Sequence, residues 1–482
     1  MDLTVGDVLE ATGAAAVPDP GDADLRAVRA MPFHEPVVDS RQVLPGDLFV
    51  ALPGTRTDGT YFAPDAFARG ALAALVRETP PITEAQRAAR RGVLGDPHPA
   101  PFAALVAPAP LDALHQVARS WRGRCGHVQV VGVTGSVGKT TTREAIAAVL
   151  AEAMPTLTSQ RSYNNEIGLP LTLLRLERRH RAAVLEMGMY ARGEIAALAR
   201  MAQPQIGVVT MVAPVHLERL GSLEAIAAAK DELVLALPPG GVAVLNGDDA
   251  RVRAMAALAP ARPVFFGLGE GNDWRAVAVD DRGLAGLAFT LRRGTWEARI
   301  ETRVVGRHFL HALLAAAAVA EALEVSPARI AAALGRVRIG ERQRFLQGPA
   351  GRLIIDDAWN ASLPSMLAAL DVLAAVPRRR VAVLGEMLEL GPQSEAAHRA
   401  VGRRAGEVVA ALVAVGRGGA TIAAEARRAG LPREAALAVP GTGEVPGVAP
   451  ALLRAGDGVL VKGSRGLHLE ETVRWLLDER GQ

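Results

Sequence analysis

HVQVVGVTGSVGKTTTREAIAAVL, residues 127–150, predicts a buried β-strand, a glycine-containing loop and the start of a helix. Gly135 and Gly138 allow the loop to turn tightly, so that its backbone N–H groups can surround phosphate oxygens at the helix start. Lys139 would reach the terminal phosphates of a nucleotide, and the Thr140 hydroxyl would ligate Mg²⁺. The stretch therefore predicts a site for the phosphates of a nucleotide at the carboxyl end of a strand.

This loop departs from the strict P-loop pattern at one place. Val133 stands where the first glycine of that pattern belongs, although the shorter GxxGKT form remains. The alternative is a merely structural turn, and the strand–loop–helix context favours phosphate binding instead. The predicted ATP contacts in the loop are Thr134, Gly135, Ser136, Val137, Gly138, Lys139, Thr140 and Thr141.

Outward from the loop, apolar runs alternate with helical patterns to about residue 335, and a second such set follows. The strand-like runs are AAVLEMG, QIGVVTMV and GVAVLNGDD in the first set, and RLIIDD, RRVAVLG, ALVAVG and DGVLVKG in the second. Alternation of this kind is typical of parallel α/β sheets. We predict an α/β fold of three domains: a small mixed α/β N-terminal domain (1–100), a central P-loop-type parallel-sheet ATPase domain (101–335) and a C-terminal Rossmann-like α/β domain (336–482).

The N-terminal hundred residues mix short strands, such as PVVDSR and DLFVAL, with loops rich in turn-forming residues. The proline-dense stretch GDPHPAPFAALVAPAP, residues 95–110, is predicted to be a linker. A helix is expected next, over Leu111–Arg124.

Composition excludes several classes of protein. Half of the 482 residues are hydrophobic, 22% are charged and the net charge is only +3, which fits packed globular domains. The sequence contains no basic run with interleaved aromatic residues, which argues against a dedicated nucleic-acid binder. The N-terminus lacks the basic residues of a secretory signal. The apolar stretch His311–Ala322 is too short to span a bilayer, so it predicts a buried helix.

Cys125 is the only cysteine, so neither an internal disulfide nor a cysteine-based metal cage can form. We expect a cytoplasmic monomer.

Lysine is rare in this chain. Of 54 basic residues, only Lys139, Lys230 and Lys462 are lysines. Arginine can replace lysine where charge alone matters, but it cannot lose its proton or act as a nucleophile. The three survivors are therefore candidate active-site residues, unless they are chance remnants.

Lys230 lies on the apolar stripe of a predicted helix that also carries Leu223, Ile226, Leu233 and Leu237. Desolvation there would lower the pKa of the amine, and a neutral amine can combine with CO₂ to form a carbamate that binds metal. The alternative is a lysine that reaches the surface or pairs with a neighbouring acid. Spacing alone favours this alternative.

Polar residues follow many of the predicted strands, where open parallel sheets bind ligands. Such residues follow strands in many proteins, and a lone histidine is more often structural than a metal ligand. Two divalent cations could nevertheless be held by a group of four residues. The predicted metal set is Thr140, Glu186, His216 and Lys230, and the predicted catalytic set is Lys139, Glu186, His216 and Lys230.

Several motifs together resemble the ATP-dependent Mur ligases of peptidoglycan synthesis, over nearly the whole chain. They are VVDSRQVLPGDLFVALPGTRTDGTYFAPDAFARGA, TGSVGKTTT, YNNEIGLPLTLL, LEMGMYARGEI, HLERLGSLEAIAAAKDEL, LNGDD, DDAWNASLPSM, VLGEMLELGPQSEAAHRAVG and VLVKGSRG. The LGEMLELG stretch and the histidine that follows it resemble the members that add a D-alanyl-D-alanine dipeptide. The DNPR motif of the members that add the third residue is absent.

The resemblance implies a mechanism and a set of contacts. ATP would phosphorylate the terminal carboxylate of a UDP-muramoyl tripeptide, and the amino group of D-alanyl-D-alanine would attack the acyl phosphate. In family relatives the lysine at the position of Lys230 is carbamylated. The resemblance also implies UDP-sugar contacts from Ser40, Arg41 and Asn165, and further contacts to nucleotide or dipeptide from Arg342 or Arg344, Asp357, Asn360, Lys462 and Arg465.

Two positions depart from the family pattern. Ala312 stands where an asparagine near the adenine is usual, so recognition of the base is not explained. Trp359 replaces a usual tyrosine, which keeps an aromatic surface but loses a hydroxyl.

Three other functions remain to be separated from the dipeptide-adding ligase. Another member of the superfamily, such as the tripeptide-forming ligase or a folate polyglutamylating enzyme, would prefer a different amine. A P-loop kinase would release a phosphorylated acid without any need for an amine. A nucleotide-binding scaffold would turn nothing over, but the presence of all three lysines argues against it.

Overall fold

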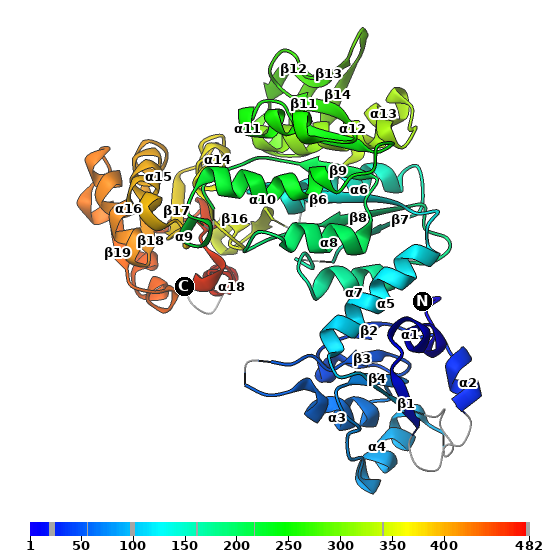
Figure 1. Cartoon of the computed structure of the whole chain (residues 1–482). Helices are drawn as coiled ribbons and strands as arrows, with labels where there is room; N and C mark the ends of the chain where they lie inside the picture. The colour runs from blue at the N-terminus through cyan, green and yellow to red at the C-terminus, as the bar shows by residue number, and fades with distance from the viewer. Residues whose placement is uncertain are drawn as a thin grey trace. The chain divides into compact units, whose positions relative to one another are not determined.

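The computed structural model describes most of the chain. It covers residues 1–18, 25–54, 56–96, 102–160, 162–215, 217–339 and 342–478. Within this part, strands form sheets of five, nine and six members (Figure 1). The chain divides into two compact units, one made of Met1–Gly132, Met154–Gly188 and Glu194–Gln205, the other of Val133–Ala153, Met189–Gly193 and Ile206–Gln482.

The five-stranded sheet is built from the N-terminal residues, in the order β1-β5-β4-β3-β2. Its strands are β1 (Ala15–Pro18), β2 (Pro36–Val37), β3 (Leu48–Val50), β4 (Ala73–Val76) and β5 (Ala103–Val106), with α1 (Val5–Thr12), α2 (Leu25–Ala30), α3 (Ala63–Ala68) and α4 (Glu84–Leu94). Only β1 runs antiparallel to its neighbour. A small mixed α/β domain was predicted here, and the sheet confirms it.

The segment predicted to be a linker instead contains β5. Ala103 pairs with Ala73 of β4, and Phe102 packs edge-on against Phe67 with ring centroids 4.9 Å apart. All residues from Phe102 to Leu105 are buried. The flanking prolines concealed a short apolar run that is long enough to form a strand. The predicted domain boundaries stay predictions.

The nine-stranded sheet has the order β14-β13-β12-β11-β10-β9-β6-β8-β7. Its strands are β6 (Gln129–Thr134), β7 (Thr156–Thr158), β8 (Ala182–Glu186), β9 (Ile206–Val209), β10 (Val242–Asn246), β11 (Arg262–Gly267), β12 (Trp274–Asp281), β13 (Leu287–Arg293) and β14 (Trp296–Thr302). The apolar runs predicted to be strands are confirmed as β6, β8, β9 and β10. An antiparallel extension, β12-β13-β14, was not predicted. β14 alternates apolar and polar residues, and the apolar run of β13, Leu287–Phe289, is only three residues long.

The helices that accompany this sheet include the four that were predicted: the helix after the proline-dense stretch, the one that follows the glycine loop, the one that carries Lys230 and the one over His311–Ala322. They are α5 (Pro110–Arg124), α6 (Lys139–Ala151), α7 (Gly168–Leu174), α8 (Glu194–Ala202), α9 (Leu217–Leu220), α10 (Leu223–Leu235), α11 (Ala250–Ala254), α12 (Leu310–Ala322) and α13 (Pro327–Arg336). Nearly every side chain of α12 is buried, and its alanines allow close packing against α6. Among the described residues, no helix is long and apolar enough to cross a membrane.

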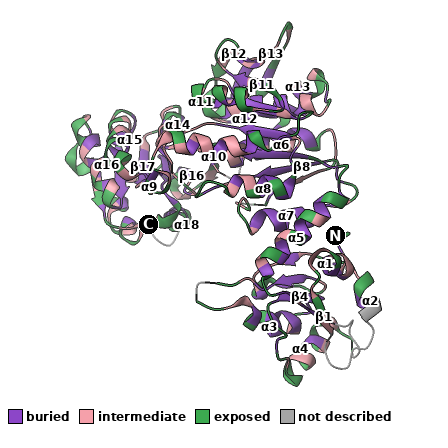
Figure 2. Ribbon diagram, viewed as in Figure 1, coloured by how far each residue is buried: buried purple, intermediate pink, exposed green. Residues whose placement is uncertain are grey.

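The six-stranded sheet lies in the C-terminal part, in the order β15-β16-β20-β17-β18-β19. Its elements are β15 (Arg344–Gln347), β16 (Leu353–Asp357), β17 (Arg380–Gly385), β18 (Ala411–Val415), β19 (Ala436–Val439) and β20 (Gly458–Lys462), with α14 (Leu363–Ala374), α15 (Ser394–Val408), α16 (Arg417–Arg428), α17 (Val445–Val448) and α18 (Glu470–Leu477). Only β15 is antiparallel. Buried residues gather on the strands and exposed ones on the outer sides of the helices (Figure 2). The α/β domain predicted here is confirmed.

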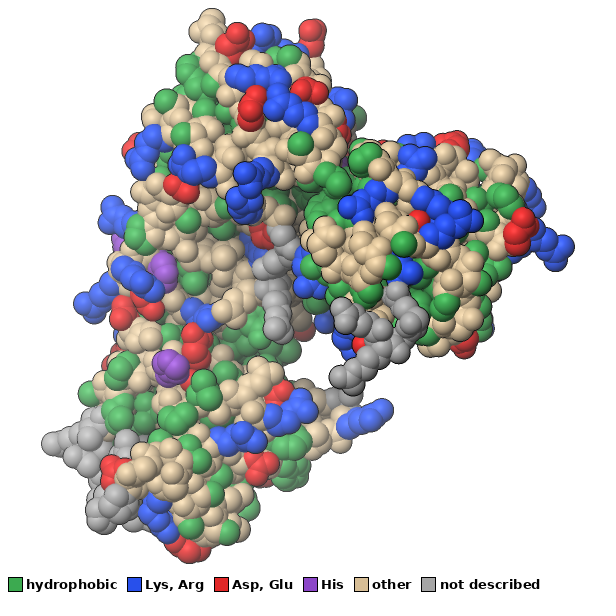
Figure 3. Space-filling model, turned by 180° about the vertical axis from the view of Figure 1, so that it is seen from behind, with side chains coloured by type: hydrophobic (Ala, Val, Ile, Leu, Met, Phe, Trp, Pro, Cys, Tyr) green, Lys and Arg blue, Asp and Glu red, His purple; other side chains and the backbone are tan. Residues whose placement is uncertain are grey.

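Basic and acidic side chains intermingle on the face of the molecule that Figure 3 shows. Among the exposed ion pairs of the chain, Arg282 donates to Asp280 at 2.9 Å and to Glu301 at 3.1 Å, and Arg399 donates to Glu395 at 2.6 Å. Exposed pairs of this kind contribute about 0–1 kcal/mol each. Arginine therefore supplies the ordinary surface charge of this chain.

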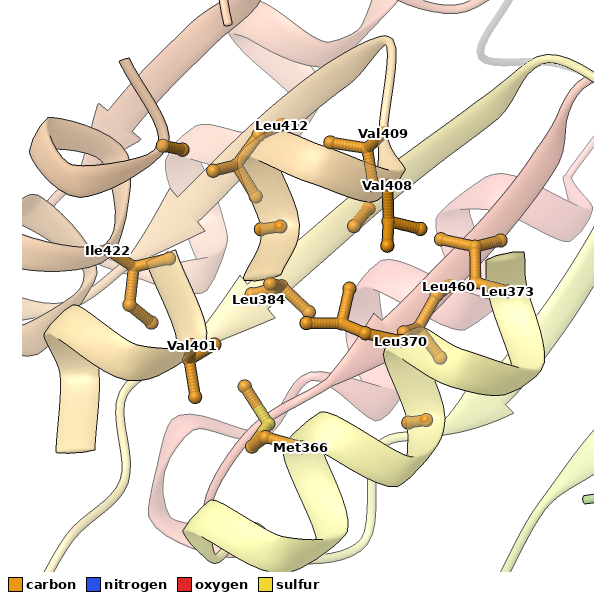
Figure 4. Close-up of a cluster of buried hydrophobic side chains, with 14 of the residues drawn as sticks. Met366, Leu370, Leu373, Leu384, Val401, Val408, Val409, Leu412, Ile422 and Leu460 are labelled. Atoms are coloured by element: carbon orange, nitrogen blue, oxygen red, sulfur yellow. The ribbon is translucent and has the colours of Figure 1, made fainter. Parts of the chain in front are cut away.

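We predict that Leu370→Ala lowers the stability of the C-terminal domain by about 2–5 kcal/mol, because a cavity opens in a packed core. Leu370 is fully buried among Met366, Leu384 and Leu460 (Figure 4). Urea unfolding followed by circular dichroism measures the loss. The control is Leu477→Ala, since that side chain is 36% exposed and should cost less than about 1 kcal/mol. Equal losses in the two variants would contradict the assignment of this core.

Candidate active site

The loop between β6 and α6 requires glycine at two positions. Gly135 has a φ of 146°, and a Cβ added there would lie 1.9 Å from Thr210 Oγ1 and 3.1 Å from the Met211 nitrogen. Gly138 has a φ of 88° and precedes the first residue of α6. Side chains rarely adopt such φ values, and no side chain fits against Thr210. Thr210 was not predicted from the sequence, because no motif marks it.

The same loop is tied to the segment that follows β9. Ser136 donates its backbone N–H to the Met211 carbonyl at 2.8 Å and its hydroxyl to the Ala213 carbonyl at 3.0 Å. Thr210 donates its hydroxyl to the Val137 carbonyl at 2.6 Å. The loop conformation is therefore fixed before a ligand arrives, as an anion-binding loop at a helix start needs.

Lys139 and Thr140 begin α6. The Lys139 ammonium donates to the Gly135 carbonyl at 2.7 Å, so it lies along the loop. Thr140 is 5% exposed, and its hydroxyl accepts a hydrogen bond from Arg342 at 2.6 Å. Thr134 is buried at the end of β6, and Thr141 is half-buried in the first turn of α6. This arrangement can bind a nucleoside polyphosphate.

Lys230 is buried in α10, with 1% of its surface exposed. The apolar stripe is confirmed, since Ile226, Leu233 and Leu237 are buried beside it, while Leu223 is half-buried. Burial, together with repulsion from the nearby Lys139 ammonium, lowers the pKa of Lys230 to about 7. A substantial fraction of this amine is therefore neutral near pH 7.

Glu186 ends β8 and is 1% exposed. It accepts a hydrogen bond from Asn164 at 2.8 Å, and its backbone N–H donates to the Ser159 hydroxyl at 3.3 Å. Asn165 is exposed, and its side-chain oxygen accepts the Gly168 N–H at 2.9 Å at the start of α7. Asn164 is an addition to the predicted set, and its amide orients the carboxylate.

The predicted metal ligands are only partly described. His216 lies outside the described residues. Among the described residues, no three His, Cys, Asp or Glu side chains are grouped to hold a metal ion. A search for three such side chains does not test the predicted set, because only two of its members, Glu186 and His216, are of those types. The predicted metal site therefore stays a prediction.

Lys462 and Asp357 end neighbouring strands, β20 and β16, and face each other in register. Lys462 is 2% exposed; its ammonium lies 2.8 Å from the Asp357 carboxylate and donates to the Asn360 carbonyl at 2.9 Å. The structure thus brings three predicted residues together at the carboxyl edge of the C-terminal sheet.

Two arginines lie over the Trp359 ring. The guanidinium carbon of Arg465 is 3.9 Å from the ring centroid and that of Arg342 is 5.3 Å from it. Arg465 is exposed and has no ion pair within the described part of the chain. Arg344 instead faces Asp356 across the β15–β16 ladder and donates to it at 3.0 Å. The two arginines of GERQRF therefore have different partners.

Ser40 and Arg41 begin a short 3₁₀ turn in the N-terminal domain. Ser40 is 8% exposed. The exposed Arg41 side chain donates to both carboxylate oxygens of Asp39, at 2.9 and 2.8 Å, and these hydrogen bonds lower the pKa of Asp39 to about 2. The turn therefore presents a guanidinium that is already bound to a carboxylate.

Ala312 is buried in α12 and offers no hydrogen bond from its side chain. Its neighbour His311 lies 2.9 Å from the Asp248 carboxylate, which also accepts the backbone N–H groups of Leu268 and Gly269. Sequence reasoning did not single out this cluster, because its members are far apart along the chain.

Three family models match consecutive parts of the chain. Residues 32–122 match the Mur ligase family, catalytic domain; residues 133–320 match the Mur ligase middle domain; and residues 341–465 match the Mur ligase, glutamate ligase domain.

Individual relatives match over most of their length. A UDP-N-acetylmuramoyl-tripeptide–D-alanyl-D-alanine ligase from Mycobacterium tuberculosis is 39% identical over 438 residues, which are 87% of this chain and 84% of the relative. The structure of MurF from Acinetobacter baumannii has a TM-score of 0.82 at 27% identity and covers 98% of both chains. That of MurF ligase from Thermotoga maritima in complex with ADP has a TM-score of 0.74 at 26% identity, covering 92% of this chain and 96% of that one.

We predict that Gly135→Ala raises the Kd for ATP more than about tenfold, because a Cβ meets Thr210 and the backbone must leave its present conformation. Titration calorimetry with ATP measures the change. Gly240→Ala is the matched control, since nothing lies within 4 Å of a Cβ at that position. ATP binding by Gly135→Ala at the wild-type affinity would show that the loop is not the phosphate site.

Proposed function

Because this chain belongs to the Mur ligase family, we infer that it is an ATP-dependent ligase that joins D-alanyl-D-alanine to UDP-N-acetylmuramoyl-tripeptide. The observation that carries this inference is the match, over most of the chain, to relatives named for that reaction. The preformed phosphate loop supports it. The reaction consumes ATP, yields ADP and phosphate, and belongs to peptidoglycan synthesis.

The proposed chemistry proceeds in two steps. The terminal carboxylate of the tripeptide attacks the γ-phosphorus of ATP, which gives an acyl phosphate and ADP. The amine of D-alanyl-D-alanine then attacks the acyl carbon, and the tetrahedral intermediate expels phosphate as the amide forms. The loop N–H groups and Lys139 neutralise charge on the transferred phosphoryl group. Closure of the C-terminal domain would keep water from hydrolysing the acyl phosphate.

We propose that Mg²⁺ is held by Thr140, Glu186, His216 and a carbamate on Lys230. The residues suit the ion, because hydroxyl and carboxylate oxygens are hard donors and the Lys230 amine is buried with a pKa of about 7. A neutral amine can take up CO₂, which a guanidinium cannot. When bound, the cations would neutralise phosphoryl charge.

The remaining predicted residues divide between two ligands. For the nucleotide we propose Arg342 rather than Arg344, because of the two only Arg342 contacts Thr140, in the first turn of α6. Asp357 and Asn360 would act with it. For the incoming dipeptide we propose Lys462 and Arg465. The UDP-sugar contacts would come from Ser40, Arg41 and Asn165.

Arg465 suits the carboxylate of the dipeptide for a physical reason. A guanidinium that stacks on an aromatic ring keeps its N–H donors in its own plane, where a carboxylate can accept two of them. Arg465 stacks on Trp359 and has no carboxylate partner among the described residues. We also propose that the enzyme acts as a monomer in the cytoplasm, where ATP is available.

We expect phosphate release from ATP to require both UDP-N-acetylmuramoyl-tripeptide and D-alanyl-D-alanine, because the acyl phosphate must be consumed by an amine. A coupled phosphate assay that omits one substrate at a time measures this requirement. Supplying a single amino acid, such as the one that forms the third residue of the peptide, in place of the dipeptide tests for the activities of other members of the superfamily. Turnover that continues unchanged without the dipeptide would favour the kinase.

We predict that Lys230→Arg reduces kcat by roughly a hundredfold or more without rescue by bicarbonate, since arginine keeps the charge but cannot form a carbamate. The phosphate assay measures kcat. A carbamate signal in NMR spectra with ¹³C-bicarbonate should be present in wild type and lost in the variant. Arg404→Lys, at an exposed ion pair, is the matched control and should retain activity. Full turnover by Lys230→Arg would exclude the carbamate.

A further inference from the structure

His398 is a buried histidine in α15 whose ring nitrogens both have backbone partners. It is 1% exposed. Nδ1 lies 2.6 Å from the Ser394 carbonyl, which can only accept, so Nδ1 carries the proton. Nε2 lies 2.9 Å from the backbone nitrogen of Met387, whose N–H can only donate, so Nε2 offers its lone pair. The imidazole is therefore neutral and held as one tautomer.

The surroundings of the ring keep it in this state. A Cβ at Gly418, in the first turn of α16, would lie 2.3 Å from Nε2, so the ring fills the space beside that glycine. Burial lowers the pKa of His398, although the Ser394 carbonyl and the Glu386 carboxylate both favour the charged form. The ring is thus a fixed hydrogen-bond acceptor for Met387.

Met387 belongs to the loop Glu386–Gly391, which follows β17. This loop exchanges two hydrogen bonds with Ser464: Leu388 donates its N–H to the Ser464 hydroxyl at 2.9 Å, and Ser464 donates its N–H to the Glu386 carbonyl at 3.2 Å. Ser464 is 4% exposed and directly precedes Arg465. His398 is therefore connected to Arg465 through the backbone of this loop and its two hydrogen bonds to Ser464.

The loop places an apolar side chain beside Arg465. Leu388 is 44% exposed, and its Cδ1 would lie 3.1 Å from a Cβ at Gly466, so the leucine rests on the backbone next to Arg465. A cation without a carboxylate partner and an exposed leucine match a small dipeptide that carries methyl groups and a free carboxylate.

We propose that His398 is a positioning residue for the dipeptide site: it holds the Glu386–Gly391 loop, which presents Leu388 to the methyl groups of the dipeptide and, through Ser464, fixes Arg465 for its carboxylate. The inference rests on the proposed function.

Two amide substitutions test the role of the ring nitrogens separately. The Gln side chain reaches as far as Nε2, so His398→Gln can still accept the Met387 N–H. The Asn side chain reaches only as far as Nδ1, so His398→Asn can serve Ser394 but leaves Met387 without its acceptor. We expect His398→Asn to raise the KM for D-alanyl-D-alanine about tenfold, because a buried N–H loses its partner. The KM values for ATP and UDP-N-acetylmuramoyl-tripeptide should change less than about twofold. His398→Gln should raise the KM for D-alanyl-D-alanine much less than His398→Asn does, because it keeps an acceptor for the Met387 N–H.

A second variant covers the case in which His398→Asn fails to fold. Ser464→Ala removes the acceptor of the Leu388 N–H at the other end of the chain of hydrogen bonds, and it should raise the same KM. The matched control is Thr472→Val, because Thr472 is 1% exposed in the same domain and its hydroxyl has no hydrogen-bond partner. That variant should leave all three KM values unchanged.

The outcomes separate this inference from the proposed function. If wild type needs the dipeptide and His398→Asn raises its KM selectively, or Ser464→Ala does so where His398→Asn does not fold, the positioning role holds. It is overturned if the three KM values rise together, or if His398→Gln and His398→Asn raise the KM for the dipeptide equally. It is also overturned if that KM is unchanged in both His398→Asn and Ser464→Ala. Wild-type turnover that does not need the dipeptide contradicts the proposed function itself.

Discussion

The close approach of Gly135 to Thr210 decides the conformation of the loop on which nucleotide binding depends. With a Cβ distance of only 1.9 Å, no other residue fits at position 135. The hydroxyl of Thr210 in turn holds the Val137 carbonyl, so the backbone N–H groups of the loop are arranged before phosphate binds. The positions of Lys139 and Thr140 follow from this loop, because they begin the helix that it leads into. A phosphate site built from backbone requires little reorganisation on binding, which is the advantage of preorganised donors.

Two of the three lysines, Lys230 and Lys462, are almost fully buried, whereas many arginines form ion pairs at the surface. Burial alone does not distinguish the two kinds of cation, because Arg122 and Arg143 are buried as well. At Lys462, one small ammonium meets the Asp357 carboxylate and the Asn360 carbonyl in a space where a planar guanidinium would leave donors unsatisfied. At Lys230 the decisive property is the proton, because burial and the charge of Lys139 bring the pKa to about 7. Scarcity of lysine in the sequence thus indicates positions where size or proton loss matters.

Sequence reasoning succeeded where the signal is local. Apolar runs predicted the parallel strands of two sheets, and an alanine-rich stretch predicted the buried helix α12. It failed for the antiparallel strands β12 to β14, whose apolar residues alternate with polar ones or form only a short run, and for β5, which is flanked by prolines. It also could not choose between Arg342 and Arg344, because the choice depends on Thr140, about two hundred residues away. Contacts over such distances depend on packing, which local patterns do not encode.

The spacing inside LGEMLELGPQSEAAHRAVG gains a physical meaning from the helix that begins within it. Ser394 starts α15, and His398 lies four residues later, so both occupy the same face one turn apart. The Ser394 carbonyl therefore meets Nδ1 of the ring, which leaves Nε2 free to reach back across the turn to Met387. A histidine one residue earlier or later would point to another face of the helix. In sequence the motif only distinguishes one kind of ligase from another, but in the fold its spacing fixes which nitrogen carries the proton and which holds the loop.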